Sequence, residues 1–453
     1  MSVPNPLRPA AGTPRPYHFP DFTHRQLPSG LTVWVVPLPD REMVSVQLLV
    51  DGGAAAETEA EGGLAALTAE TLITGTRRLD GHAFAEATER LGIEITADSS
   101  WDVARAGFSA LADRYGAGIE LLAEMVREPR FDEGEFDRLR EERLADILQA
   151  RSEPGRLAEE YFLRHCYADD SPYGRLSAGT PETVEPLTVS LAHGHHQRHW
   201  RPDRAHLIVA GPVTDDEVAQ RVEATLGDWE GTSPGHRAIA TTDRGGRRVV
   251  IVDRPGSVQS ELRIGHVGIQ RDHPDYFPAI VMAAVLGGTF SARLNQRLRE
   301  ELGYTYGARS SFDPRRSPGP FAARAAVQTE VTADAVRETL ALVEGMRAAP
   351  PPEAELREVT DFLVRVFPLR FETTGGAAAG IEPIAVYGLA HDWWATYRDR
   401  IEAVGPAQVH AAARDLLRPS EALILVTGDA ERVRPDLEAA QLGPIEVVRP
   451  ADD

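Results

Sequence analysis

The sequence predicts two homologous domains in which helices pack on β-sheets. Helical and strand-like patterns alternate over a first block of about 200 residues, which is typical of an α+β or α/β domain. The segment RPDRAHLIVAG, from Arg201 to Gly211, matches RPSEALILVTG, from Arg418 to Gly428, at a separation of 217 positions (428 − 211 = 217). Five of the paired residues are identical. A repeat of this length predicts two copies of one fold, and a chain of 453 residues can bury a core in each.

The first copy is expected at residues 23–229, after a proline-rich extended arm at residues 1–22. Its pattern begins with β-rich runs and ends with a strand and an acidic helix. Strands are predicted at 31–37, 43–50, 95–110 and 206–211, and helices at 63–73, 81–91, 112–126, 132–151, 154–166, a stretch ending at 198, and 214–228.

A polar, glycine-bearing linker is predicted at residues 230–246, which leaves 247–453 for the second copy. Residues 281–309, VMAAVLGGTFSARLNQRLREELGYTYGAR, indicate an apolar helix, a glycine turn, a basic helix and an aromatic strand entry. The glycine-rich stretch 373–383 lacks the Gly-Lys-Ser/Thr of a nucleotide loop, so we expect a flexible connection or hinge there. Trp393 and Trp394 are expected on a helix packed through its aromatic side.

Charge and cysteine content narrow the classes of function. The chain has 69 acidic and 48 basic residues, a net charge of −21, which argues against a nucleic-acid partner and favours basic peptides. Its one cysteine, Cys166, cannot form an internal disulfide or a thiolate zinc cluster, and a packed thiol is expected. No apolar run reaches the ~18 residues of a membrane helix, and the N-terminus has no hydrophobic signal core. A cytoplasmic protein without membrane contact is therefore expected.

The histidines of HGHHQRH, residues 193–199, are a candidate metal site. His195 and His199 are one helical turn apart, which would place both imidazoles on one face. No carboxylate or cysteine nearby completes a ligand set, so a polar helix surface is the preferred interpretation.

The layout resembles the pitrilysin and insulinase superfamily of inverted-zincin peptidases, most closely subunits of the mitochondrial-processing-peptidase type. The resemblance covers residues 24–447 and rests on the frame Gly63-Leu64-Ala65 with Gly75-Thr76, on VLGGTFSARL and on REELGYTY. It implies an α+β fold of two homologous domains, each a mainly antiparallel sheet packed by helices.

The same resemblance implies a zinc motif, His-x-x-Glu-His, inside the frame of the first domain. Two imidazoles one turn apart would hold the metal, with a carboxylate between them as general base. Here the histidine positions are Ala66 and Glu70 and the general-base position is Ala69. The third ligand position on the later charged helix is assigned to Arg140, next to Glu141. We therefore expect no cofactor and no peptide cleavage by this chain alone.

The second-half segment, unlike the first, keeps the residues that the resemblance assigns to it. By the resemblance, Gly287 and Gly288 let the backbone approach a ligand, and Arg299 and Tyr306 hold the substrate peptide. Arginine and tyrosine are donors suited to a peptide carbonyl and its developing oxyanion. The alternative is that Arg299 is one of several solvated arginines, with Arg293 and Arg297, and that Tyr306 is a core aromatic. Tyr304 is the main competitor, because residues 304 and 306 would share one strand face.

Two functions remain open from the sequence. The first is the zinc-less subunit of a heterodimeric metallopeptidase that binds unfolded or short peptides, with zinc expected in a homologous partner. The second is a non-enzymatic peptide-binding or scaffold protein that forms a homodimer. A zinc peptidase that recruits ligands from the histidine cluster is a weaker third.

Overall fold

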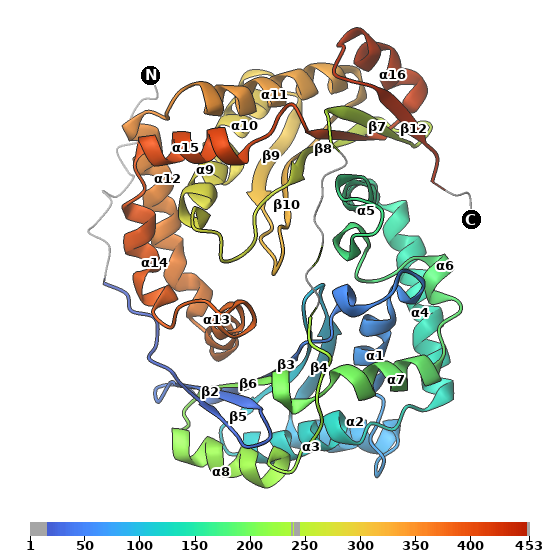
Figure 1. Cartoon of the computed structure of the whole chain (residues 1–453), viewed down its shortest axis with the longest axis vertical. Helices are drawn as coiled ribbons and strands as arrows, with labels where there is room; N and C mark the ends of the chain where they lie inside the picture. The colour runs from blue at the N-terminus through green and yellow to red at the C-terminus, as the bar shows by residue number, and fades with distance from the viewer. Residues whose placement is uncertain (1–15, 237–238, 240–244, 451–453) are drawn as a thin grey trace.

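The computed structural model describes residues 16–236, 239 and 245–450. Its backbone forms two six-stranded sheets, one from each half of the chain (Figure 1). The first sheet has the order β1-β2-β6-β3-β5-β4, with bounds Thr23–Gln26, Thr32–Pro37, His206–Gly211, Met43–Val50, Ala104–Leu111 and Glu94–Ser99. The second has the order β12-β7-β11-β8-β10-β9, with bounds Ile445–Val448, Arg248–Asp253, Leu423–Gly428, Gln259–Val267, Pro320–Gln328 and Thr305–Phe312.

Five strands of each sheet repeat one topology. The order β2-β6-β3-β5-β4 in the first sheet corresponds to β7-β11-β8-β10-β9 in the second. In both, the first pair is parallel and the others are antiparallel. The repeated sequence segments end in β6 and β11, the equivalent strands. This confirms the predicted α+β fold with two homologous, mainly antiparallel sheets.

In the first half the helices follow the predicted order, with the short α6 in addition, and the predicted basic helix of the second half is the short α10 followed by a π-helical turn at Gln296–Glu301. The first half contains α1 to α8, with bounds Leu64–Leu72, Gly81–Leu91, Tyr115–Arg127, Glu133–Ser152, Pro154–Cys166, Pro181–Val184, Val189–His199 and Asp215–Leu226. The second contains α9 to α16, with bounds Tyr276–Gly287, Arg293–Asn295, Thr332–Ala348, Glu353–Val366, Thr374–Tyr387, Trp393–Glu402, Pro406–Leu416 and Ala430–Ala439. Within the described ranges, no helix has the length and apolar character needed to cross a membrane.

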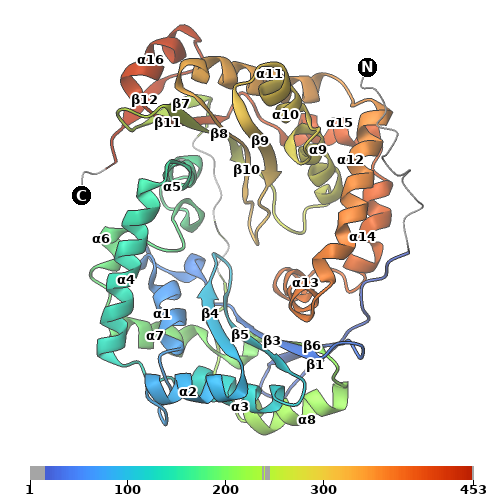
Figure 2. The same cartoon turned by 180° about the vertical axis from the view of Figure 1, so that it is seen from behind.

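Each half lends one helix to the sheet of the other half. The helix α13, from the second half, lies against β3 and β6, whereas α5, from the first half, lies against β8 and β11. Both views of the chain show this exchange (Figures 1 and 2). The helix α5 buries Phe162 and Cys166 in one cluster with Val250 and Leu425 of the second sheet. The expected packed thiol is confirmed, and the exchange ties the halves together.

The prediction of a flexible connection at residues 373–383 is wrong, because most of this stretch belongs to α13. The hydroxyl of Thr373 accepts a hydrogen bond from the Gly376 amide at 3.0 Å and caps the helix N-terminus. A Cβ on Gly380 would lie 2.9 Å from ring atoms of both Phe19 and Phe371. The small residues therefore serve close packing, which compensates for their poor helix propensity.

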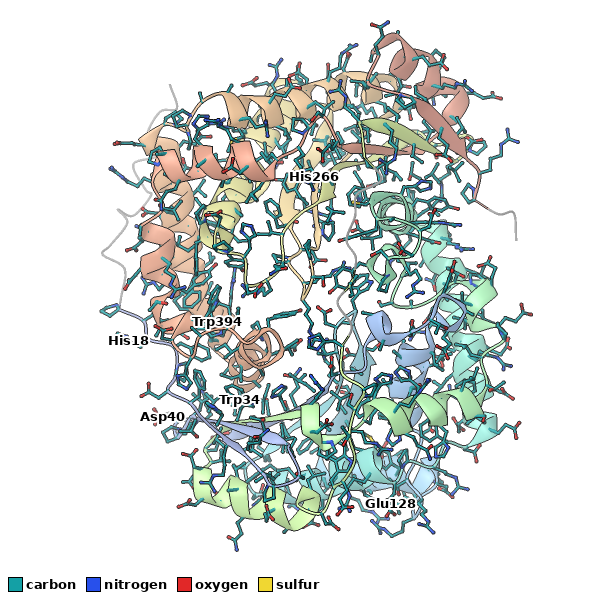
Figure 3. The ribbon with its side chains drawn as sticks, in the orientation of Figure 1. His18, Trp34, Asp40, Glu128, His266 and Trp394 are labelled. Carbon is teal, nitrogen blue, oxygen red and sulfur yellow. The ribbon has the colours of Figure 1, made fainter. Side chains whose placement is uncertain are left out.

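An aromatic cluster lies at the boundary between the halves. Phe22 packs near Trp34 of β2, with ring centroids 6.1 Å apart, and Phe19 near Trp394 of α14, at 6.3 Å. Trp34 and Trp394 are labelled in Figure 3, on opposite sides of this boundary. Residues 16–22 of the predicted arm have no helix or strand, while residues 1–15 lie outside the described part of the chain. Trp393 and Trp394 are buried on a helix, as expected.

Polar contacts join the halves beside this cluster. The buried carboxylate of Asp102 accepts hydrogen bonds from the hydroxyls of Tyr173 at 2.6 Å and Tyr387 at 3.2 Å, and from the backbone amide of Arg316 at 3.0 Å. The side chain of Arg316 also pairs with Asp51 at 2.5 Å. Arg316 lies in the loop between β9 and β10, so this loop of the second half is held by two carboxylates of the first. Part of the predicted linker, residues 237, 238 and 240–244, lies outside the described residues.

Candidate functional site

The helix that would carry the zinc motif is α1, and its frame is intact. Gly63 precedes the helix with φ +93°, and a Cβ there would lie 2.8 Å from the carbonyl oxygen of Ala178. The carboxyl of Glu57 accepts hydrogen bonds from the amides of Gly63, at 3.2 Å, and Ala65, at 2.6 Å, which satisfies the helix N-terminus. Burial raises the pKa of Glu57 to about 8, against the lowering effect of these two amides.

The side chains inside that frame do not fit a zinc ion. Ala66 and Ala69 are buried and offer no lone pair. Glu70 is partly exposed, and its carboxylate contacts the guanidinium of Arg143, on α4. Arginine carries only donors, so it cannot be a metal ligand. In the part of the chain that the structure describes, no group of three or more His, Cys, Asp or Glu side chains could hold a metal ion.

The residue of α4 that faces Glu70 is Arg143, three positions after the predicted Arg140. Arg140 instead donates a hydrogen bond to the carbonyl of Leu187 at 3.0 Å and pairs with Asp137 at 3.1 Å. The register of a long, evenly charged helix is not readable from its sequence, because no apolar stripe marks the inward face.

The histidine cluster is not a polar helix surface, and that interpretation is wrong for three of its members. His195, His196 and His199 are buried on α7. Their ring nitrogens hydrogen-bond to the carbonyls of Gly52, Val126 and Asp51 at 3.2, 2.8 and 3.2 Å. Burial lowers the pKa of His195 to about 3 and that of His196 to about 4, so both are neutral at pH 7. These hydrogen bonds join α7 to the end of α3 at Val126 and to the segment after β3 at Asp51 and Gly52.

The glycine turn after α9 packs tightly against β9. A Cβ on Gly287 would lie 2.4 Å from the backbone nitrogen of Ser310, so this glycine permits contact between helix and strand. Gly288 is exposed at the turn. Asn295 then links the turn to the strand, since its side chain donates to the carbonyl of Thr289 at 3.1 Å and accepts from the amide of Ala308 at 2.8 Å. These contacts hold the turn against β9.

Arg299 differs from the other two arginines of its helix. Arg293 pairs with Glu355 at 2.7 Å, and Arg297 pairs with Glu338 at 2.8 Å, so both are tied to other helices. Among the residues that the structure describes, the ion pair of Arg299 is only with its neighbour Glu300, at 3.5 Å. Its guanidinium lies 4.5 Å from the ring centroid of Phe290.

The backbone around Arg299 departs from a regular α-helix. Residues Gln296–Glu301 form a turn of π-helix, a distortion that is frequent at functional sites. Phe290, which the sequence analysis did not single out, is 67% exposed in the glycine turn. In the sequence, a phenylalanine flanked by Gly-Gly-Thr and Ser in the glycine turn was the feature that could have identified Phe290.

Tyr306 is 91% exposed at the start of β9, so it is not a core aromatic. Tyr304 is partly buried against the hydrophobic core of the second half and precedes β9. Of the two tyrosines, Tyr306 is therefore the more accessible to a ligand. Both Arg299 and Tyr306 are accessible from solvent, whereas the α1 site is closed by Glu70 and Arg143.

Together, the fold and this site define a class of protein: a two-domain peptidase fold that lacks metal ligands at the α1 position. Comparison with family models agrees: residues 33–177 match the model described as insulinase (peptidase family M16), and residues 186–363 match the model described as peptidase M16 inactive domain. The chain belongs to the insulinase family M16 and lacks its zinc motif.

Relatives match this chain over most of its length. An uncharacterized zinc protease of Streptomyces coelicolor is 24% identical over 88% of each chain. A protein of Helicobacter pylori described as a non-peptidase homolog is 24% identical over 72% of this chain and 76% of its own. The crystal structure of an M16 inactive domain from Pseudomonas fluorescens superposes with a TM-score of 0.84 and 22% identity, covering 90% of this chain and 98% of that one. This last likeness shows the fold.

Proposed function

We propose that this chain is the zinc-less subunit of a two-subunit metallopeptidase, in which a homologous partner supplies the His-x-x-Glu-His site. The observation that carries the proposal is the contrast between the two halves. The α1 position is closed by an ion pair between Glu70 and Arg143. In the second half, Tyr306 is 91% exposed, and Arg299 has no ion pair with another helix in the described part of the chain.

In this proposal Arg299 and Tyr306 hold a substrate peptide. The guanidinium and the phenol are donors, so both can hydrogen-bond to a peptide carbonyl and stabilise the negative charge that develops on its oxygen. Phe290 lies under the guanidinium and limits its orientations. Zinc bound in the partner would activate the attacking water, and this chain contributes binding and orientation only.

Charge and shape limit the substrate class. The net charge of −21 favours basic peptides over acidic ones. An extended segment can present its carbonyls to Arg299 and Tyr306, while the carbonyls of a folded domain are already paired. We therefore infer that the substrates are unfolded or short peptides.

A second candidate, a non-enzymatic peptide-binding or scaffold homodimer, is favoured by the Helicobacter pylori relative, whose description names a non-peptidase homolog. Co-purification from the native organism separates the two. The first proposal expects a bound chain of similar length that carries an intact His-x-x-Glu-His and hydrolyses unfolded peptides only in the complex. A stable homodimer that stimulates no peptidase would contradict it and support the second candidate.

A further inference from the structure

A cavity of about 460 Å³ lies at the boundary between the two halves. The first half contributes Asp51, Arg204 and His206 to its wall, and the second contributes Arg271, Arg316 and Tyr387. None of the residues at the α1 position or in the glycine turn lines it. It is thus distinct from the site described above.

Arg271 is an unusual member of this wall because it is buried without a counter-charge. Three arginines of the described chain are less than 9% exposed: Arg263, Arg271 and Arg315. Arg263 pairs with Glu261 at 2.9 Å and Arg315 with Asp313 at 2.7 Å. Arg271, 7% exposed, has no carboxylate of the described residues within ion-pair distance, and its Nη1 has no hydrogen-bond partner there.

Aromatic rings hold the Arg271 guanidinium in place. It lies 4.2 Å from the ring centroid of Tyr276 and 5.0 Å from that of Trp393. Such contacts orient a cation but do not satisfy its N–H groups, which are fixed in one plane. A buried charge with unmet donors is costly unless another group pairs with it.

Three carboxylates also line the cavity, and each contacts a group other than Arg271 and Arg204. Asp51 pairs with Arg316 and lies 3.3 Å from His236. Asp203 accepts from the amide of Ser233 at 2.9 Å, and Asp272 accepts from the side chain of Gln270 at 2.7 Å.

A second arginine in the wall also lacks a counter-charge. Arg204 is exposed and has no ion pair with any described residue. Arg271 and Arg204, one from each half, therefore both line this cavity without an ion pair to any described residue, in a chain of net charge −21.

We propose that this cavity binds an oxyanion, a carboxylate or a phosphate group, through the guanidinium groups of Arg271 and Arg204. The planar fork of arginine matches both anions in two-point hydrogen bonds. The source of the anion is either a free small molecule or the C-terminal carboxylate of a peptide. Because the two arginines belong to different halves, the bound anion bridges the halves and stabilises their association. This site is independent of the proposed peptidase function.

Thermal unfolding of the isolated chain tests the proposal without a partner subunit. We expect citrate or inorganic phosphate, at millimolar concentration and ionic strength matched with chloride, to raise the unfolding temperature with a saturable dose dependence. Binding to the native state alone shifts the midpoint in this way. A short peptide with a free C-terminal carboxylate, compared with its C-terminal amide, distinguishes a peptide end from a small anion as the source.

Three variants assign any shift to this cavity. Arg271→Met removes the buried cation and should abolish the shift, and Arg204→Gln, at an exposed position, should weaken the apparent affinity at least tenfold. Arg400→Met is the matched control, because Arg400 lies 5.5 Å from the same Trp393 ring but does not line the cavity. If Arg271→Met does not fold, the effect of Arg204→Gln on the anion-dependent shift alone tests the proposal. The proposal is overturned if none of the anions gives a saturable shift, or if Arg204→Gln responds like the native chain.

Discussion

The carboxylate of Glu70 on α1 contacts the guanidinium of Arg143 on α4, and the family resemblance puts one metal ligand at the position of Glu70 and another on α4. A zinc site needs lone pairs from both helices, and arginine has none to offer. The contact is instead an ion pair between helices, with 30% of the Glu70 side chain and 17% of the Arg143 side chain exposed. The first half has therefore replaced metal chemistry with a structural contact.

Breaking this ion pair should destabilise the fold. Arg143→Met leaves Glu70 without its partner in a partly buried place, and we expect the free energy of unfolding to fall by about 1–2 kcal/mol, between the values for exposed and buried pairs. Arg138→Met is the control, because Arg138 pairs with Glu135 and Glu142 on an exposed surface of the same helix. Urea denaturation measures both. Equal losses of unfolding free energy in the two variants would show that the ion pair with Glu70 stabilises the fold no more than an exposed ion pair does.

Restoring the ligands should restore zinc binding only when Arg143 is also changed. We expect the triple variant Ala66→His, Ala69→Glu, Glu70→His to bind zinc weakly, because the guanidinium repels the cation and occupies the facing position. Adding Arg143→Glu should give about one zinc per chain, measured by elemental analysis after dialysis. If the triple variant retains as much zinc as the quadruple variant, Arg143 does not face the metal position.

The buried Glu57 predicts a specific pH dependence of stability. Its pKa rises from 4.5 in the unfolded chain to about 8 in the folded one, chiefly through burial. The folded state thus holds a proton that the unfolded state has lost, so the stabilising contribution is complete below pH 4.5 and disappears as the pH rises through about 8.

The isosteric variant Glu57→Gln cannot ionise. Relative to it, the native chain should lose more than about 2 kcal/mol of stability between these two pH values. Thermal unfolding over this pH range measures the difference, and Glu59→Gln, at an exposed position, provides the control. A constant difference between native chain and Glu57→Gln would refute the assignment.

The contacts of Asp102 predict how strongly the halves hold together. Asp102→Ala would leave two tyrosine hydroxyls and the amide of Arg316 without their acceptor. We expect a loss of about 3 kcal/mol in unfolding free energy and faster proteolysis between the halves. Tyr387→Phe removes only the longest of these hydrogen bonds and should cost about 1 kcal/mol. Equal sensitivity of both variants to protease would contradict the central role of Asp102.

Much of the fold was predictable because its elements have strong local signals. Strand alternation from Val44 to Val50, the charged helix before Pro154 and the repeat between Gly211 and Gly428 each indicated structure that is present. The exchange of α5 and α13 between halves was not predictable, because a helix is amphipathic whichever sheet it covers.

The errors in the predicted site have physical causes as well. Gly380 suggested flexibility, yet it is needed where aromatic rings press on α13. His195 is polar by type, but a carbonyl behind α7 satisfies it in the core. Arg271 gave no signal at all, because the lack of a counter-charge is a property of three-dimensional packing. In contrast, Arg299 and Tyr306 were singled out by a motif resemblance, and their accessibility is consistent with it.

The activity of the reconstituted complex tests the central claim most directly. The complex of this chain with its zinc-bearing partner would be assayed on an unfolded basic peptide, with native chain, Arg299→Ala, Tyr306→Phe and the control Arg297→Ala, whose native side chain is occupied by Glu338 and Glu301. We predict that kcat/KM falls by about 100-fold or more for Arg299→Ala, as for the loss of one oxyanion donor, and by a smaller factor for Tyr306→Phe. Arg297→Ala should remain near the native value. Full activity in the Arg299→Ala or Tyr306→Phe complex would contradict the substrate-holding role proposed for this chain.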